Sequence, residues 1–252
     1  MKQFCLIFIA AFTLCVACSK YVEVDKSSQE LIGEGVALME AKKYNKAAQK
    51  FENAILNAEI PADAQDAQRR LADAYFMDKN FLDAVAAYEV YYDIYYQSPY
   101  APYILNRLGL SYSNMSMNPK RDQTYAVKST EYFDQLEALH PEEFKNYGAE
   151  SERQNMYMKL SEHEYQVGRY YMRTSKPESA IMRFRYLLDN YPTSHRVEDS
   201  YISMIKSALK LDDGAVSASQ YLKELVDSYP DNGDIKSLTK KVNKKQKIYH
   251  EE

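Results

Sequence analysis

The sequence predicts an all-α protein, an α-solenoid of about five helical hairpins stacked in a row. Two observations carry this prediction. Glycine and proline are scarce, with 7 and 8 among 252 residues, which is too few for the many turns of a β-sandwich or barrel. Apolar residues recur at spacings of three and four, and this spacing places side chains on one face of a helix. Both observations favour amphipathic helices joined by short turns.

Residues 1–17 are typical of a lipoprotein signal peptide. Lys2 precedes the apolar run Phe4–Leu14, which is too short to span roughly 30 Å of membrane hydrocarbon as a helix. The segment from Cys15 to Ser19 resembles the lipobox of bacterial lipoproteins, with small Ala17 directly before Cys18. The resemblance implies that Cys18 becomes the lipidated first residue of the mature chain. The alternative is an ordinary cleaved signal that leaves a spare thiol.

Residues 18–28 are mostly polar, and we expect them to form a lipidated tether between the membrane and the body. All three cysteines lie within the first 18 residues, so the mature chain forms no internal disulfide. The formal net charge is −4, from 32 basic and 36 acidic residues. Because nucleic-acid binding needs a broad positive field, nucleic acid is excluded as an expected partner.

A repeated pattern begins at Tyr44. The spacing three, four, three occurs in Tyr44, Ala47, Phe51, Ala54, then in Phe81, Ala84, Tyr88, Tyr91, and again in Pro177, Ala180, Phe184, Leu187. Five units follow, and their central apolar residues are Phe51, Tyr88, Phe133, Phe184 and Leu222. We place units one to three in residues 29–141, units four and five in residues 142–235, and a basic C-terminal helix that caps the stack in residues 236–252.

Small residues lie upstream of these anchors, in a partner helix. Examples are Gly35, Ala72, Gly109 and Gly168. The set resembles the signature of tetratricopeptide (TPR) repeats, in which small residues let two helices approach closely while aromatic rings fill the gap. The resemblance implies a right-handed solenoid, in which each hairpin buries its apolar stripe by stacking on its neighbours.

Two stretches depart from the basic unit. The third unit carries a longer loop, from Asn114 to Tyr125, in which Asp122 or Thr124 is expected to cap the following helix. Residues 144–174 contain no helix breaker except Gly148 and Gly168. We expect one helix of about thirty residues there, roughly 45 Å long, which would join the front three units rigidly to the rear two.

The sequence does not support catalysis. It contains no glycine-rich phosphate loop, paired catalytic carboxylates or serine elbow, and no cofactor is implied. The four histidines show no metal-ligand spacing, so no metal site is predicted. His163 is flanked by Glu162 and Glu164, but adjacent helical positions diverge. We therefore expect His163 on a solvated helix face.

Two features point to binding. Tyrosines crowd the second unit, where they serve either interhelix packing or an exposed peptide groove. Arginines surround the fourth hairpin, at positions 173, 183 and 185, and Arg183 directly precedes the core residue Phe184. An arginine at the edge of a buried stripe can offer a planar pair of donors to a partner carboxylate. The alternative for these arginines is a solvated or intrachain ion pair.

Several motifs together resemble the BamD family, lipoproteins of the β-barrel assembly machinery in Gram-negative outer membranes. The resemblance runs from Cys18 to about Pro230. It rests on Asn106-Arg107-Leu108-Gly109-Leu110, Arg121-Asp122-Gln123-Thr124, the segment from Glu164 to Tyr171, and Arg183 nine residues before Pro192.

The resemblance implies a scaffold that helps to insert and fold outer membrane proteins. Such a chain is lipid-anchored at the outer membrane with its body in the periplasm, beside other lipoproteins of the machinery. Its rear repeats dock on the barrel component BamA, and the candidate residues are Arg173, Arg183 and Arg185. Its front repeats form a groove for unfolded barrel proteins, and the candidate residues are Tyr75, Tyr88, Tyr92 and Tyr96.

Two other functions fit a periplasmic repeat lipoprotein. One is a different TPR adaptor, serving envelope constriction or peptidoglycan attachment, which usually carries an N-terminal coiled coil. No coiled coil precedes Leu31 in this sequence. The other is a glycan-binding lipoprotein that uses the tyrosines.

Overall fold

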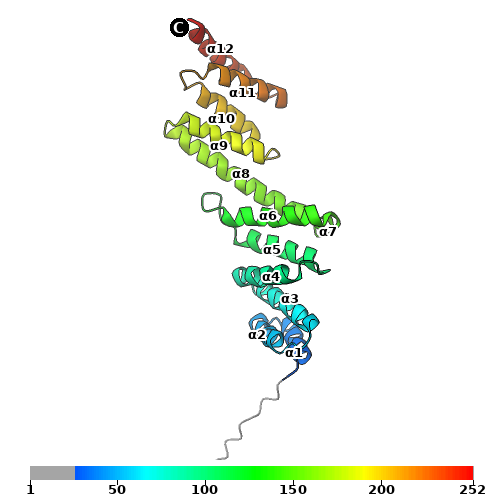
Figure 1. Cartoon of the computed structure of the whole chain (residues 1–252). Helices are drawn as coiled ribbons and strands as arrows, with labels where there is room; N and C mark the ends of the chain where they lie inside the picture. The colour runs from blue at the N-terminus through cyan, green and yellow to red at the C-terminus, as the bar shows by residue number, and fades with distance from the viewer. Residues whose placement is uncertain (1–25, 252) are drawn as a thin grey trace, which may run out of the picture.

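The computed structural model describes residues 26–251 as an extended stack of α-helices, with no strand among these residues. The helices are α1 Ser28–Glu40, α2 Tyr44–Leu56, α3 Pro61–Met77, α4 Phe81–Tyr95, α5 Ala101–Met115, α6 Thr124–Leu139, α7 Pro141–Asn146, α8 Ala149–Arg173, α9 Pro177–Asn190, α10 Val197–Ala208, α11 Ala215–Ser228 and α12 Ile235–Glu251. Figure 1 shows them in chain order from one end of the stack to the other. The predicted all-α solenoid is confirmed.

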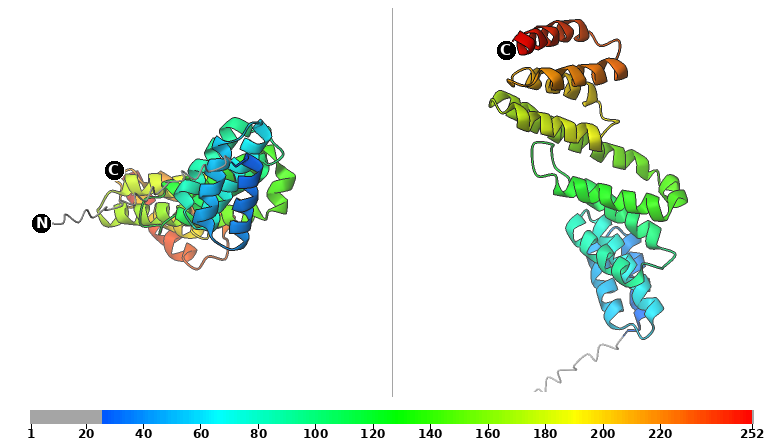
Figure 2. Two further views of the ribbon diagram at one scale, coloured as in Figure 1. Left: turned by 90° about the horizontal axis from the view of Figure 1, so that it is seen from below. Right: turned by 45° about the horizontal axis from the view of Figure 1, so that its top comes forward.

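Contacts in the stack are local. Each helix packs on the next helix in the chain, and α6 also packs on α8 past the short α7. The right-hand view of Figure 2 shows successive helices crossing in alternating directions. The first helices of consecutive hairpins also touch, α1 with α3, α5 with α8, and α8 with α10. They therefore share one side of the solenoid. A stack of this kind derives its stability from each hairpin and from the interface to the next.

Close packing within three hairpins depends on a glycine facing a phenylalanine ring. A Cβ atom added to Gly35 would lie 2.4 Å from the ring of Phe51. The same addition at Gly109 would lie 2.6 Å from Phe133, and at Gly168 2.6 Å from Phe184. Any larger residue would collide with the ring, so these glycines set the distance between the two helices of a hairpin.

Three hairpins also share one turn. Lys42, Lys79 and Ser175 adopt the left-handed conformation, with φ of 56°, 61° and 56°. In each case the next amide donates to the carbonyl five residues back, as in Asn80 to Tyr75 at 2.9 Å. This is the Schellman pattern, which satisfies carbonyls at the end of the first helix and directs the chain into the second.

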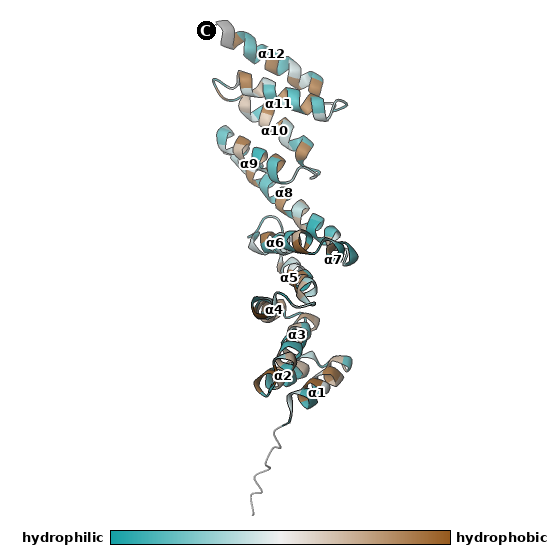
Figure 3. Cartoon of the chain, turned by 45° about the vertical axis from the view of Figure 1, so that its right-hand side comes forward, coloured by the Kyte–Doolittle hydropathy of each residue, from teal (hydrophilic) through white to brown (hydrophobic). Residues whose placement is uncertain are grey.

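The predicted core is confirmed. Phe51, Tyr88, Phe133 and Phe184 are fully buried, and Leu222 is 9% exposed. Hydrophobic and hydrophilic residues alternate along the helices in Figure 3, so the core is a series of layers between helices. At the end of the stack, α12 buries Leu238 and Val242 against α11.

The expected helix of about thirty residues is wrong. The chain breaks into α7 and α8 at Gly148, whose φ of +65° is a left-handed conformation that only glycine adopts without strain. Phe144 of α7 is buried beside Leu105 and Phe133, and this contact turns α7 away from the axis of α8. In the loop before α6, Asp122 does accept the amide of Thr124, at 2.6 Å.

Candidate functional site

The predicted tyrosine groove of the front repeats does not form as a single surface. Tyr88 is fully buried, and its hydroxyl donates to Asp73 at 2.7 Å. Its inclusion among accessible groove residues is therefore wrong, because a partner cannot reach it. Tyr96, which caps the end of the same helix, is 58% exposed. The other two candidates, Tyr75 and Tyr92, are half-buried.

The half-buried tyrosines connect neighbouring helices. The hydroxyl of Tyr75 donates to Glu52 of α2 at 2.7 Å. Burial, together with this hydrogen bond, raises the pKa of Tyr75 to about 12. The hydroxyl of Tyr92 accepts from Gln135 of α6 at 3.1 Å. Interhelix packing therefore accounts for both side chains.

The sequence analysis did not predict the carboxylates that accept hydrogen bonds from the tyrosine hydroxyls. Asp73 on α3 accepts from Tyr88 and Tyr103, both at 2.7 Å, and from Arg69 at 3.1 Å. Burial and the nearby Asp73 raise the pKa of Tyr103 to about 12. The spacing of four between Arg69 and Asp73 was the available signal, because it predicts an ion pair on one helix face.

The three arginines of the rear repeats have different surroundings. Arg183 on α9 donates from Nη1 to Glu164 of α8, 3.1 Å from Oε2. Arg185 donates to Glu224 of α11 at 3.2 Å. Arg173, at the end of α8, has no ion-pair partner among the described residues and lines two cavities. The structure does not gather them into one cluster.

Those two cavities adjoin along α8. The first, of about 630 Å³, lies between α8 and the long loop before α6, which contributes Pro119 and Lys120. The second, of about 620 Å³, lies between α8, α10 and the turn before α12. Both are lined by Tyr165, Arg169 and Arg173 of α8. We call the two cavities together the α8 groove.

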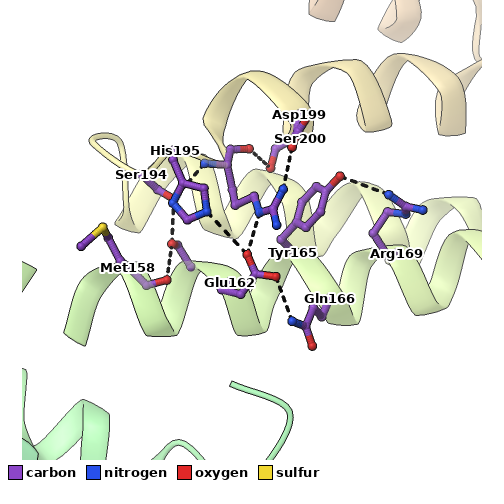
Figure 4. A network of polar contacts seen from close by, with 11 residues as sticks. Met158, Glu162, Tyr165, Gln166, Arg169, Ser194, His195, Asp199 and Ser200 are labelled. Carbon is purple, nitrogen blue, oxygen red and sulfur yellow. Dashed lines mark hydrogen bonds and ion pairs between the residues drawn. The ribbon is translucent and has the colours of Figure 1, made fainter. Parts of the chain in front are cut away.

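A polar network joins α8 to the start of α10 beside the α8 groove (Figure 4). The ring of Tyr165 is 8% exposed and lies between two guanidinium groups, 4.6 Å from that of Arg196 and 5.9 Å from that of Arg169. Arg196 donates to Glu162 at 2.6 Å and to Asp199 at 2.8 Å. Partial burial alone would raise the pKa of Glu162, but the hydrogen bonds from Arg196 and Gln166, together with the charge of Arg196, outweigh burial and lower that pKa.

The long loop is fastened to α8. His163 Nδ1 lies 2.6 Å from the carbonyl oxygen of Pro119, and Lys159 donates to Ser116. The expectation that His163 lies on a solvated helix face is therefore wrong, because the loop folds back over this part of α8. Between residues 26 and 251, no three His, Cys, Asp or Glu side chains are placed to hold a metal ion.

The α8 groove was not predicted as a site. Its signal in the sequence is two pairs of basic residues, each with a spacing of four. Arg169 and Arg173 lie on α8, whereas Lys206 lies on α10 and Lys210 directly after it. Each pair alone is an ordinary solvated helix face. Only the packing of α10 beside α8 brings the two pairs to one groove.

Stacked helical hairpins define a class, the helical-repeat proteins. Residues 24–225 match the YfiO family, described as outer membrane lipoproteins, and the chain belongs to this family. The predicted resemblance to BamD is thereby confirmed.

Two relatives carry names that agree with this family. The outer membrane protein assembly factor BamD of Rickettsia prowazekii (strain Madrid E) is 25% identical over 185 residues, 72% of each chain. The putative assembly factor BamD of Aquifex aeolicus (strain VF5) is 25% identical over 224 residues, which cover 83% of this chain and 73% of the relative. The main prediction, an outer membrane protein assembly factor, is confirmed over the two alternatives.

Solved structures of TPR proteins are also similar. The TPR2AB domain of yeast Sti1, from a complex with pHSP90, is 14% identical, with a TM-score of 0.39 over 89% of this chain and 86% of that one. TTC0263, a TPR protein of Thermus thermophilus, is 13% identical, with a TM-score of 0.37 over 86% of this chain and 99% of that one.

Proposed function

We propose that this chain is a lipid-anchored, non-catalytic scaffold of the β-barrel assembly machinery. In this role its rear repeats dock on a BamA-like barrel protein, and it also contacts other lipoproteins of the machinery and unfolded outer membrane proteins. Membership in a family of outer membrane lipoproteins supports the proposal. So does the stacked architecture, because a series of hairpins offers separate surfaces to separate partners.

The anchor belongs to the same proposal. Cys18, which would carry the lipid, lies outside the described residues. None of the helices between residues 26 and 251 is both long and apolar enough to cross a membrane. Several acyl chains on Cys18 would hold the body at the outer membrane, with the repeats in the periplasm.

The surroundings of Arg183 support the proposed docking surface. Arg183 is 44% exposed, whereas its partner Glu164 is 12% exposed. Glu164 therefore holds the guanidinium in a fixed direction through Nη1 alone, and no described residue occupies Nε or Nη2. An arginine that is oriented in advance and keeps unused donors can bind a partner carboxylate with little loss of side-chain entropy.

A charge swap tests this docking surface. Arg183→Gln should weaken binding to the purified periplasmic domains of the BamA-like partner at least tenfold, which is about 1.4 kcal/mol. The double variant Arg183→Glu with Glu164→Arg keeps an internal ion pair but removes the exposed arginine from α9. It should keep the helical circular dichroism signal and still bind weakly.

The matched control is Arg185→Gln, because Arg185 lies two residues away and pairs with a different helix. It should bind within about twofold of the parent chain, since Arg185 is half-buried and its guanidinium is already paired with Glu224 inside the chain. If the swapped pair restored full binding, Arg183 would have only an internal role and the docking proposal would be refuted.

A further inference from the structure

We propose that the α8 groove binds an extended acidic segment of another polypeptide. In this groove, cations of a chain with a net negative charge gather without carboxylate partners. Arg169 and Arg173 line both cavities, Lys120 lines the first, and Lys210 lines the second. All four side chains are exposed. None of them is within ion-pair distance of a carboxylate among the described residues.

The acidic residues that line the groove already have cation partners within the chain. Arg196 bonds both Glu162 and Asp199. Asp234 lies 3.8 Å from Lys206. The groove therefore presents an excess of positive charge to any ligand. Like charges four residues apart on a helix repel each other, so a ligand that neutralised Arg169 and Arg173 would relieve an unfavourable contact of the free chain.

The spacing of the cations fits an extended peptide. Residues four apart on a helix have Cβ atoms about 5 to 6 Å apart. Alternate residues of an extended chain point the same way and lie about 7 Å apart. Carboxylates on alternate residues can therefore meet Arg169 and Arg173 in turn, and the second cavity continues towards Lys210. A compact phosphate group would instead need cations that converge on one point.

The groove is built before a ligand arrives. His163 and Lys159 fasten the long loop to α8, so Lys120 is held at one side of the groove. Arg169 donates to the hydroxyl of Tyr165 at 3.3 Å, which orients its guanidinium. Tyr170 is 54% exposed at the same cavity and offers an apolar face to the aliphatic part of a peptide. Fixed side chains lose less entropy on binding.

The inference is independent of docking through Arg183, which contacts α8 through Glu164, a residue that lines neither cavity. The test uses the mature chain and two fluorescein-labelled peptides, one of alternating Glu and Ser and one with Gln in place of Glu. Anisotropy should show binding of the Glu peptide, at least about tenfold tighter than the Gln peptide and weakened by added salt. Arg183→Gln should leave this binding unchanged.

A matched pair of variants locates the site. Arg169→Gln with Arg173→Gln should weaken binding of the Glu peptide about tenfold or more. Lys241→Gln with Lys245→Gln removes the same charge at the same spacing from α12, away from the groove and from the lysine-lined cavity of that helix, and should change binding less than about twofold. Should the first pair disturb folding, Lys210→Gln serves instead, with an expected loss of about threefold.

Three results would overturn the proposal. One is equal binding of the Glu and Gln peptides. The second is an equal loss in both pairs of variants, which would mean that only net charge matters. The third is displacement of the peptide by vesicles of anionic phospholipid whose own binding depends on Arg169 and Arg173, since the groove would then recognise a lipid surface.

Discussion

Two glycines in α1, two residues apart, should respond oppositely to the same substitution. An alanine Cβ at Gly35 would lie 2.4, 2.7 and 2.8 Å from three ring atoms of Phe51, well inside ordinary contact, which begins near 3.4 Å. Because Phe51 is fully buried, its ring must move by about 1 Å or the two helices must separate. Overpacking of this kind costs about 1 to 3 kcal/mol.

Helix propensity acts in the other direction. Alanine is about 1 kcal/mol more favourable than glycine within a helix. Since the collision at Gly35 is severe, its cost belongs in the upper part of the range, and Gly35→Ala should destabilise the hairpin by about 1 to 2 kcal/mol. A Cβ on Gly33 would have nothing within 4 Å, so Gly33→Ala should stabilise it by about 0.5 to 1 kcal/mol.

Native-state hydrogen exchange is the suitable assay. The α1–α2 hairpin lies at one end of the stack, and the end units of a repeat protein open at a lower free energy than the whole chain, so exchange of its own amides reports the effect more directly than a global melting curve. Amides of α1 should exchange about tenfold faster or more in Gly35→Ala, and more slowly in Gly33→Ala. Phe51→Leu in the Gly35→Ala chain should recover part of the loss. If both single variants shifted exchange in the same direction, the contact with Phe51 would not set the helix separation.

Two further predictions follow from backbone conformation and charge. Lys79→Gly should raise the free energy of unfolding by about 0.5 to 1 kcal/mol in denaturant titrations, because glycine adopts the φ of 61° without strain, and Lys79→Val should lower it. Glu162 has a pKa below its ordinary value of 4.5 in the folded chain, so its stabilising contribution is complete above that pH and is lost as the pH falls through the folded value. In urea titrations, Glu162→Gln should therefore make the free energy of unfolding less dependent on pH below about 4.5. If that dependence were unchanged, Arg196 would not stabilise the charged form of Glu162.

Local spacing made much of the fold predictable. The anchors Phe51, Tyr88, Phe133 and Phe184 each lie in an apolar stripe of helical period, and each follows a small residue in the preceding helix. The break at Gly148 was not predictable in the same way. Helices tolerate a single glycine. In the sequence, Gly148 looks no different from Gly35 and Gly168, at which the helix continues without a break. The burial of Phe144 against α5 and α6 decided where the helix ends.

The sequence by itself determined the helical class, the repeat and the core anchors, because these depend on residues within one or two turns of each other. Tertiary structure decided the surfaces. It buried Tyr88, gave Arg183 and Arg185 different partners, and set Arg169 and Arg173 beside Lys210 in the α8 groove. The physical reason is that charge pairing depends on distances between side chains of different helices, and the angles at which those helices stack fix these distances.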